Sequence, residues 1–392
     1  MSELIPAGWS ADLDFLKEAA GLHRQSWLPD DPQVAAEIRR QLLMNLSLAY
    51  FVYFQSDADH PDFSPFLNSV FLLQPNPDDT YFLAHVDGRG TYRLSGDRGT
   101  VKLLTLTIGD RMIGMTETPG PQLAEHDLDQ IGLAGDGTID ILLSSERPEG
   151  HDGAWLQLAP SAKFLMIRQR SYDWGGEGAA RIAIERLDGD PLRPRWSAAE
   201  TDDRIHAAIG FAERLSRQWL LYVNDLKAKL APNTMNFTGF AQFGGVQVQT
   251  YWQAIFDIGP DEALILETDL PATRPYWNVQ LNDEIWNTLD YVWRQSSLNG
   301  AQAAIDGDGK FRAVIAASDP GVPNWLDTVG RQTGTVVGRW YACDSQPVPV
   351  LTKVRLADVR SHLPADTGIV SPDERAAAVR ARARGAQLRR RW

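Results

Sequence analysis

The chain has 392 residues, 43% of them hydrophobic and 23% charged, which excludes a disordered polypeptide and favours two domains. Its 51 acidic and 38 basic residues give a formal net charge of -13, which disfavours nucleic acid and anionic membranes as partners. A single cysteine, Cys343, excludes an internal disulfide and any multi-cysteine metal site. No stretch approaches the roughly 20 apolar residues of a membrane helix, and the first residues lack the pattern of a secretory signal. We therefore expect a cytoplasmic protein.

The N-terminal part, residues 1–66, is predicted to be helical. Pro32 is a typical first residue of a helix after a capping Asp31, and apolar residues then recur at helical spacing until about Gln55. The loop that follows is acidic, and the side chains that could hold a hard cation through oxygen are Asp57, Asp59, His60 and Asp62. A solvated connection is the simpler interpretation, and we expect no metal site.

Residues 67–195 are predicted to form a β-rich domain. Short apolar runs there alternate with turn sequences, such as the hairpin signal from Asp87 to Gly90. A long connecting helix is expected at 196–232, because Ser197 and Glu200 have the spacing of a capping box.

The remaining chain divides into a second β-rich, jelly-roll-like domain at 233–365 and a basic helix at 366–392. Six of the 13 Trp fall in the second β part, where they would form either a dense core or a ligand-stacking wall. The C-terminal helix is opened by Ser371 and carries seven Arg. We expect it to pack on the acidic surface of its own chain, although it could instead attract an acidic partner.

Together these patterns predict a mainly β fold with helical additions: two jelly-roll-like antiparallel β-sandwich parts, a long connecting helix and terminal helices. A weak internal repeat supports two related halves, because 77–83 and 260–266 each contain a Pro-Asp turn followed by an apolar strand. Such turns are common before strands, so chance similarity is an alternative.

Motifs for the commonest cofactors are missing from the sequence. There is no P-loop, no dinucleotide-binding glycine motif, no zincin motif and no α/β-hydrolase elbow. The seven His are scattered along the chain. We therefore expect no nucleotide, redox or metal cofactor.

The segment 276–299 is dense in amides, carboxylates and aromatic side chains, and it contains most of the candidate site. If 277–281 is a strand, its apolar residues face one side and its amides the other. The amide row consists of Asn278, Gln280 and Asn282, with Trp277 as a possible stacking partner. Buried amides without partners are costly, whereas amides beside indoles are typical of a site for a polar small molecule.

A short helix is expected from Asp283 onward, and Trp286 on it would provide a second stacking surface. Asp290 and Arg294 lie four residues apart, close enough to pair. Asp290 would act as a general acid or base and Arg294 as an anion clamp, which makes them the candidate catalytic residues. The simpler interpretation is a surface ion pair of little consequence.

Two further elements offer ligand-binding side chains. The rigid turn 319–326 displays Asn324 and Trp325, and Arg339 lies at the end of the strand that follows. An Asn, a Trp and an Arg at one edge of a sandwich would bind a ligand. The alternative is that Asn324 staples the loop and Trp325 is buried.

These C-terminal residues resemble the bacterial domain of unknown function 1214. The matching segments are Tyr276-Trp277-Asn278-Val279, Arg294-x-Ser296, Asp306-Gly307-Asp308-Gly309, Asp319-Pro320-Gly321, Asn324-Trp325-Leu326 and Arg339-Trp340-Tyr341. In the N-terminal half, Asn76-Pro77-Asp78 followed by Tyr81 resembles the companion family 1254 over a shorter stretch. The resemblance implies a jelly-roll-like β-sandwich and no particular reaction.

The sequence thus predicts a protein that binds or acts on a polar small molecule at the C-terminal sandwich. Two alternatives stay open. One is a non-catalytic assembly module in which the Trp cluster forms the interface of a homo-oligomer. The other is a carrier of an apolar ligand, which requires a dry cavity.

Overall fold

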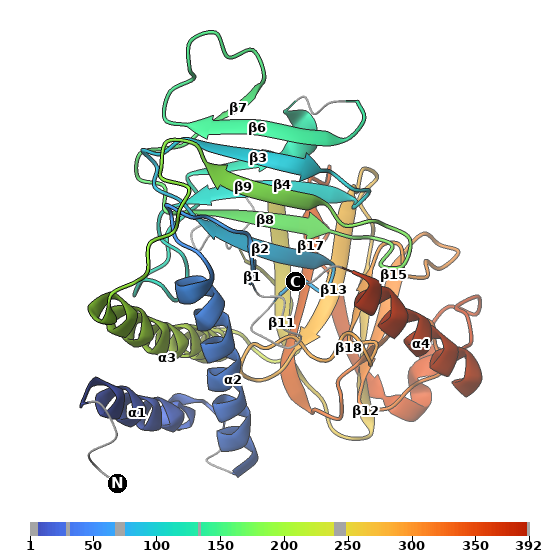
Figure 1. Ribbon diagram of the computed structural model, residues 1–392. Coiled ribbons are helices and arrows are strands. Elements are labelled where there is room, and N and C mark those ends of the chain that lie inside the picture. Colours follow the sequence, from blue (N-terminus) through green and yellow to red (C-terminus); the bar gives the residue numbers. More distant parts are fainter. Residues whose placement is uncertain (1–6, 29–31, 67–74, 132–134, 239–247, 390–392) are drawn as a thin grey trace.

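The computed structural model describes residues 7–28, 32–66, 75–131, 135–238 and 248–389, and it shows two β-sandwiches side by side with helices against them (Figure 1). The N-terminal helices are α1 (Ala7–Ala19), the 3-10 helix η2 (Ala20–Gln25), α2 (Pro32–Tyr50) and the π-helix η3 (Phe51–Gln55). The predicted mainly β class with helical additions is confirmed. Every helix in the described ranges falls short of the length and apolarity that a membrane span needs.

The N-terminal sandwich consists of a five-stranded and a four-stranded sheet. The five-stranded sheet has the order β1 (Ser64–Phe66), β2 (Asp79–His85), β8 (Phe164–Arg170), β4 (Leu103–Gly109), β5 (Ala124–Asp127). The four-stranded sheet has the order β7 (Ala154–Gln157), β6 (Thr138–Ser144), β3 (Tyr92–Asp97), β9 (Arg181–Arg186), and the short helix η4 (Leu128–Gln130) follows β5. Buried Leu, Ile and Val side chains of both sheets form one core between them.

The C-terminal sandwich again pairs a five-stranded with a four-stranded sheet. The first has the order β10 (Asn236–Thr238), β11 (Gln249–Asp257), β17 (Thr333–Tyr341), β13 (Tyr276–Asn282), β14 (Ser297–Asn299). The second has the order β16 (Trp325–Asp327), β15 (Phe311–Ala316), β12 (Glu262–Thr268), β18 (Val350–Arg355), followed by the helix η6 (Leu356–His362). In Figure 1 its strands run steeply across those of the N-terminal sandwich.

The two sandwiches have the same topology, strand for strand. Adding nine to each strand number of the N-terminal sheets gives the order of the C-terminal sheets, and even the single parallel pair recurs, as β6 with β7 and β15 with β16. The predicted internal repeat therefore exists. The segments proposed for it were wrong, because 77–83 leads into β2 whereas 260–266 leads into β12, which is the counterpart of β3.

The Trp residues of the second β part are mostly core residues. Trp252, Trp277 and Trp340 are at most 2% exposed and pack together inside the C-terminal sandwich. Trp325 and Trp286 are buried in separate clusters, and of the six only Trp293 is largely exposed. Five of the six Trp are therefore buried within the chain itself.

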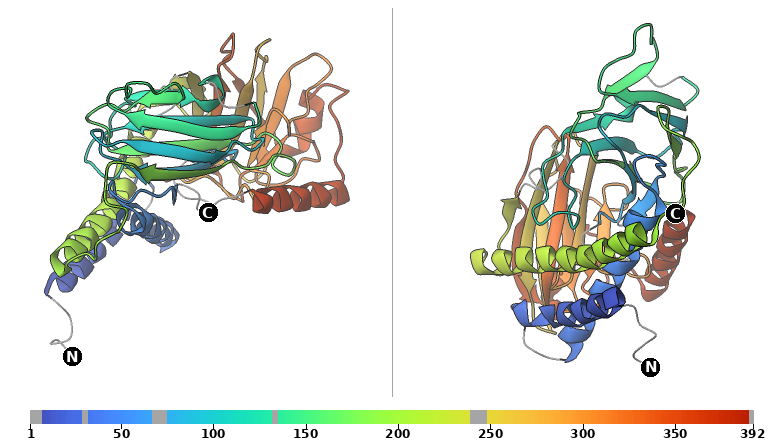
Figure 2. Two further views of the ribbon diagram at one scale, coloured as in Figure 1. Left: turned by 45° about the horizontal axis from the view of Figure 1, so that its top comes forward. Right: turned by 60° about the vertical axis from the view of Figure 1, so that its left-hand side comes forward.

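The helix α3 (Ala198–Lys229) connects the sandwiches and covers both of them (Figure 2). Ser197 and Glu200 form the predicted capping box at its start. Its first half packs Phe211 and Leu215 against the outer face of the N-terminal five-stranded sheet. Its second half packs Val223 and Leu226 against the outer face of the corresponding C-terminal sheet. These two outer faces consequently point toward a shared crease.

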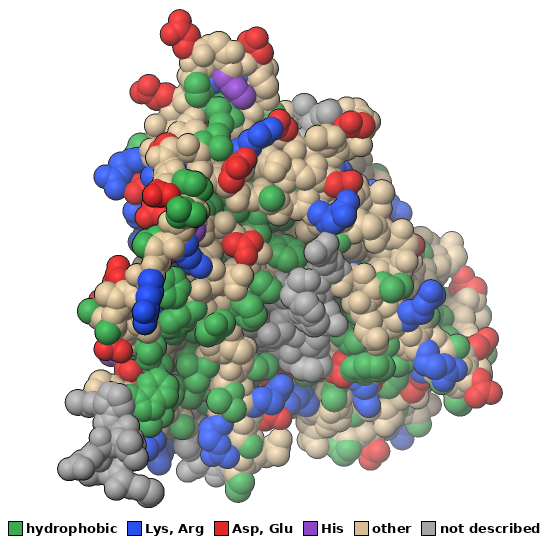
Figure 3. Space-filling model, viewed as in Figure 1, with side chains coloured by type: hydrophobic (Ala, Val, Ile, Leu, Met, Phe, Trp, Pro, Cys, Tyr) green, Lys and Arg blue, Asp and Glu red, His purple; other side chains and the backbone are tan. Residues whose placement is uncertain are grey.

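The basic helix α4 (Pro372–Leu388) lies on the opposite flank and packs on its own chain. Ala383 and Ala386 contact Trp174 of the N-terminal half and Tyr291 of the C-terminal half. Arg375 pairs with Asp319 at 2.9 Å. The helix thus joins the two halves. On the face shown in Figure 3, hydrophobic side chains gather over the N-terminal helices and charged side chains are scattered elsewhere.

Candidate functional site

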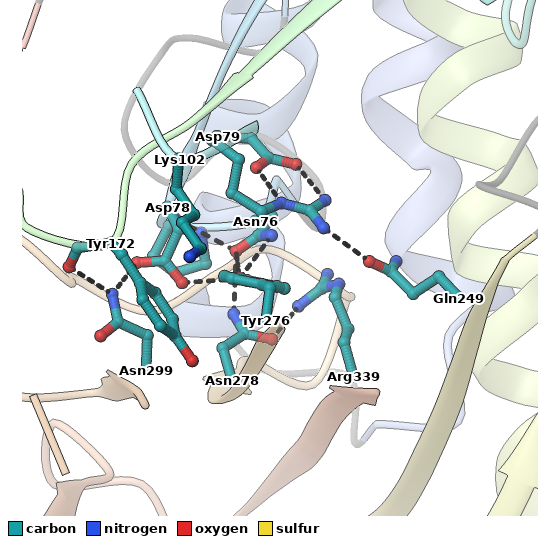
Figure 4. A network of polar contacts seen from close by, with 12 residues as sticks. Asn76, Asp78, Asp79, Lys102, Tyr172, Gln249, Tyr276, Asn278, Asn299 and Arg339 are labelled. Carbon is teal, nitrogen blue, oxygen red and sulfur yellow. Dashed lines mark hydrogen bonds and ion pairs between the residues drawn. The ribbon is translucent and has the colours of Figure 1, made fainter. Parts of the chain in front are cut away.

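The strongest concentration of buried polar side chains lies where the two five-stranded sheets meet (Figure 4). We call this set the crease network. Its members are Asn76, Asp78, Asp79, Arg170, Gln249, Tyr276, Asn278, Gln280, Asn299 and Arg339. All are at most 7% exposed, and they come from both halves of the chain.

Strand β13 supplies the amide row that the alternating pattern predicted. Trp277, Val279 and Leu281 face the sandwich core. Asn278, Gln280 and Asn282 face the crease and are fully buried. Their amide groups bond to the protein itself: Gln280 donates to Asn282 and Thr288, and Asn282 donates to Thr335. The amide groups of the row therefore have hydrogen-bond partners within the protein and need no ligand to satisfy them.

Asp78, just before β2, is the hub that ties the halves together. Its Oδ2 accepts the Tyr276 hydroxyl at 2.6 Å, and its Oδ1 accepts the Asn299 amide at 2.7 Å and the Trp174 indole at 2.8 Å. Asn76 donates to the Tyr276 hydroxyl at 2.8 Å and accepts from the Asn278 amide at 2.8 Å. A buried carboxylate is thus held by neutral donors, most of which lie about 200 residues away in the sequence.

Burial keeps the tyrosines of the crease protonated. It raises the pKa of Tyr276 well above the ordinary value, and the nearby Asp78 carboxylate adds to this effect. It also raises the pKa of Tyr81, which stands beside Asp79, and that of Tyr172, whose pKa reaches about 12. At neutral pH these phenols are hydrogen-bond donors and carry no charge.

Arg170 on β8 is a fully partnered buried cation. Its Nε and Nη2 donate to the two oxygens of Asp79 at 2.6 and 2.8 Å, and its Nη1 donates to Gln249 at 3.0 Å. Burial opposes its charge, but the carboxylate of Asp79 outweighs burial and raises the pKa of Arg170 well above the ordinary value. Its ring contacts with Tyr276 and Tyr341 add cation–π attraction.

Arg339 on β17 is equally buried, but no carboxylate of the described residues stands within ion-pair distance of it. Its Nη1 donates to the side-chain oxygens of Asn278 at 3.2 Å and Gln280 at 2.5 Å, and its guanidinium carbon lies 5.4 Å from the centre of the Tyr251 ring. Within the same described ranges, its Nε and Nη2 groups meet no hydrogen-bond acceptor. The amide row therefore orients Arg339 without neutralising it.

The predicted catalytic pair does not form. The segment after Asp283 is a series of turns instead of a helix, because the Asp283 carboxylate accepts the backbone N–H groups of Ile285 and Asn287, and Trp286 takes a positive φ of 74°. Asp290 accepts the backbone N–H groups of Val292 and Trp293.

Arg294 contacts Asp327, with Nε 2.5 Å from one carboxylate oxygen, outside the crease network. Two further predicted ligand-binding residues form hydrogen bonds to backbone groups of the chain itself. The Asn324 side chain bonds to backbone groups of Ala304 and Arg312, which staples the turn, and the Trp325 indole donates to the Ala316 carbonyl. Trp286 is fully buried against Trp219 and Tyr222 of α3, and Trp277 lies in the core. Of the predicted site residues, Asn278, Gln280, Asn282 and Arg339 come together.

Aspartates of the acidic loop after η3 form ion pairs with arginines from later in the chain. Asp57 contacts Arg193 at 3.2 Å and Asp59 contacts Arg186 at 2.5 Å. In the described ranges no group of three His, Cys, Asp or Glu side chains is arranged to hold a metal ion. In this structure, Asp57 and Asp59 of the loop therefore form ion pairs with arginines.

Comparison with known proteins finds similarity to one protein family in each half of the chain. A model of the protein family of unknown function DUF1214 matches residues 80–173 and 260–345, one stretch in each sandwich. An uncharacterized protein of known crystal structure from Burkholderia cenocepacia is 28% identical, with a TM-score of 0.82 over 89% of this chain and 97% of that one. A crystal structure from Vibrio parahaemolyticus is 13% identical, with a TM-score of 0.47 over 80% of this chain and 96% of that one. No functionally curated protein matches significantly. The resemblance of the N-terminal half to family 1254 stays a prediction.

Proposed function

We propose that the protein binds a small molecule carrying a carboxylate or a similar oxyanion, and that Arg339 in the crease is its anchor. The observation that carries this proposal is the state of the Arg339 guanidinium. It is 3% exposed, yet among the described residues only its Nη1 has acceptors. The segments 67–74 and 239–247, which precede Asn76 and Gln249 in the sequence, contain no Asp or Glu. A buried cation without a counter-ion is unfavourable, so an anionic ligand would stabilise it.

Arg170 provides an internal comparison for the ligand chemistry. Both arginines give Nη1 to amide oxygens, from Gln249 in one case and from Asn278 and Gln280 in the other. In Arg170 the Nε–Nη2 edge is filled by the two oxygens of Asp79. In Arg339 the same edge would take the ligand. This edge fits a planar carboxylate with two parallel hydrogen bonds.

The surroundings define how the ligand would be held. The amide row fixes Arg339 before binding, which reduces the ordering that the ligand must induce. The Tyr251 ring beside the guanidinium adds a cation–π contact that also holds Arg339 in place. The amides themselves are bonded to the protein, so we assign them to positioning Arg339, whereas the sequence suggested direct ligand contacts.

Calorimetric titration at pH 7 with acetate, benzoate and succinate, each compared with its neutral amide, tests the proposal. We expect at least one carboxylate to bind and its amide to bind much more weakly. Loss of a bidentate charged contact is worth about 3 kcal/mol, so Arg339→Met should weaken binding on the order of 100-fold. Arg93→Met is the matched control, because Arg93 forms a bidentate pair with Asp140 on the exposed surface. Equal binding of acid and amide, or unchanged affinity in Arg339→Met, would overturn the proposal.

A further inference from the structure

A cavity opens into the N-terminal sandwich, away from the crease network. It measures about 620 Å³ and lies between β2 and β8 of one sheet and β3 and β9 of the other. Phe63, Phe82, Ile167 and Ile182 supply apolar lining. The volume lies in the range of small-molecule sites, far above the water-sized voids of ordinary cores.

The duplicated topology shows what occupies the same place in the C-terminal sandwich. In the N-terminal half, Phe82 of β2 pairs with Ile167 of β8. Two residues further along β8, Gln169 lies between Thr80 of β2 and Leu104 of β4. In the C-terminal half the matching ladder places Trp252 opposite Gly338, and Trp340 between Thr250 and Trp277. Phe82, Gln169 and Leu104 therefore correspond to Trp252, Trp340 and Trp277.

The three indoles are buried together inside the C-terminal sandwich. Trp252 is fully buried and lies directly over Gly338, where an added Cβ would come within 1.9 Å of the indole. Trp277 and Trp340 pack beside it with ring centres 6.0 Å apart. The Trp252 indole thus fits in this position only because residue 338 is a glycine. The N-terminal half has Ile167 and Phe82 at these places, and Phe82 remains partly exposed to the cavity.

The polar groups of the cavity lie at its wall and its rim. The Gln169 amide donates to and accepts from the backbone of Ala180, which satisfies it and keeps the wall closed. Arg181 at the rim is 68% exposed, and its carboxylate neighbour Asp97 is 4.0 Å away. The cavity therefore combines apolar side chains with polar ones, and the charged side chains Asp62 and Arg181 lie at its rim.

We infer that the N-terminal sandwich binds a small amphiphile, with its apolar body between the sheets and its polar end at the rim near Asp62 and Arg181. In the C-terminal sandwich, the three indoles occupy the corresponding positions. This site is separate from the carboxylate site at Arg339. Burial of the ligand's apolar surface would provide the attraction.

Fluorescence titration with N-phenyl-1-naphthylamine, a neutral apolar probe, tests the inference on the full chain. We expect saturable binding at one site and displacement by 1-decanol. Phe82→Trp reproduces the residue of the filled half and should weaken probe binding at least tenfold, with circular dichroism unchanged. Ile182→Trp fills the cavity from β9 and should have the same effect, which covers the case in which Phe82→Trp does not fold.

Two control variants establish whether probe binding depends on this cavity. Phe15→Trp adds an indole on α1, far from the cavity along the chain, and should leave probe affinity unchanged. Arg339→Met should also leave it unchanged, because the probe has no carboxylate. Absence of saturable probe binding, or full affinity in folded Phe82→Trp and Ile182→Trp, would overturn the inference.

Discussion

Replacing each buried crease arginine by methionine distinguishes a structural cation from a ligand-binding one. Arg170→Met leaves Asp79 buried without its cation, since both Asp79 oxygens accept from Arg170 and the Asp79 side chain is 1% exposed. Removing one partner of a buried pair costs about 3–5 kcal/mol of unfolding free energy. We therefore expect Arg170→Met to lose a large part of a stability that is typically about 5–15 kcal/mol.

Arg339→Met should behave differently. It removes two hydrogen bonds to amide oxygens, which costs roughly 1–3 kcal/mol, but it also removes a buried charge that no carboxylate of the described residues balances. The two effects oppose each other, so the net change should stay within about 2 kcal/mol.

Urea unfolding at pH 7 and 25 °C, followed by far-ultraviolet circular dichroism, measures both values. The double variant Asp79→Leu with Arg170→Met is the control. It replaces the whole pair by apolar side chains and should recover most of the loss. If Arg339→Met were as destabilised as Arg170→Met, Arg339 would be a structural part of the crease, and the reasoning behind the proposed ligand site would be refuted.

Three further outcomes follow from the same contacts. Tyr276→Phe removes the 2.6 Å bond to Asp78 and should cost about 1.5–3 kcal/mol by urea unfolding, and a loss below about 0.5 kcal/mol would contradict the hub role of Asp78. Because burial raises the pKa of Tyr172 to about 12, its folded form holds a proton that the unfolded form loses near pH 10, so stability should be full below pH 10 and fall up to about pH 12. Tyr172→Phe should show a shallower fall, and identical pH curves would argue against this assignment. Arg294→Ala leaves the 2% exposed Asp327 side chain without its partner and should cost about 1–2 kcal/mol, allowing for the exposure of Arg294, while carboxylate affinity stays unchanged. A loss of carboxylate affinity in Arg294→Ala would indicate that Arg294 contributes to ligand binding.

Periodic patterns predicted the elements, because they depend on neighbours in the sequence. The capping box of α3 and the two faces of β13 formed as expected. The duplication was harder to find. The equivalent strands share ladder positions and few side chains, so the sequence paired β2 with the wrong counterpart.

The sequence predicted only the part of the candidate site that lies in the C-terminal half. Asn278, Gln280 and Asn282 follow from the alternation of β13, and Arg339 from its place at the end of β17. Across the crease, Asn278 donates to Asn76 and Gln280 donates to the Pro75 carbonyl, both in the other half, and no local pattern connects residues about 200 positions apart. Asp290 and Arg294 had helical spacing, but the side chain of Asp283 bonds to nearby backbone N–H groups and favours turns, which removed the helix on which that pairing depended.

The hub at Asp78 also bears on the order in which the chain folds. Each sandwich has its own core, and contacts within it span shorter stretches of sequence. Asp78 joins Tyr276 and Asn299, which lie 198 and 221 positions away, so these bonds close very long loops of the chain. We therefore expect the crease to assemble after both sandwiches have formed, with α3 bringing them together because it packs on both sheets. Interactions made after the rate-limiting step slow unfolding without speeding folding, so the polar crease acts mainly on the lifetime of the native state.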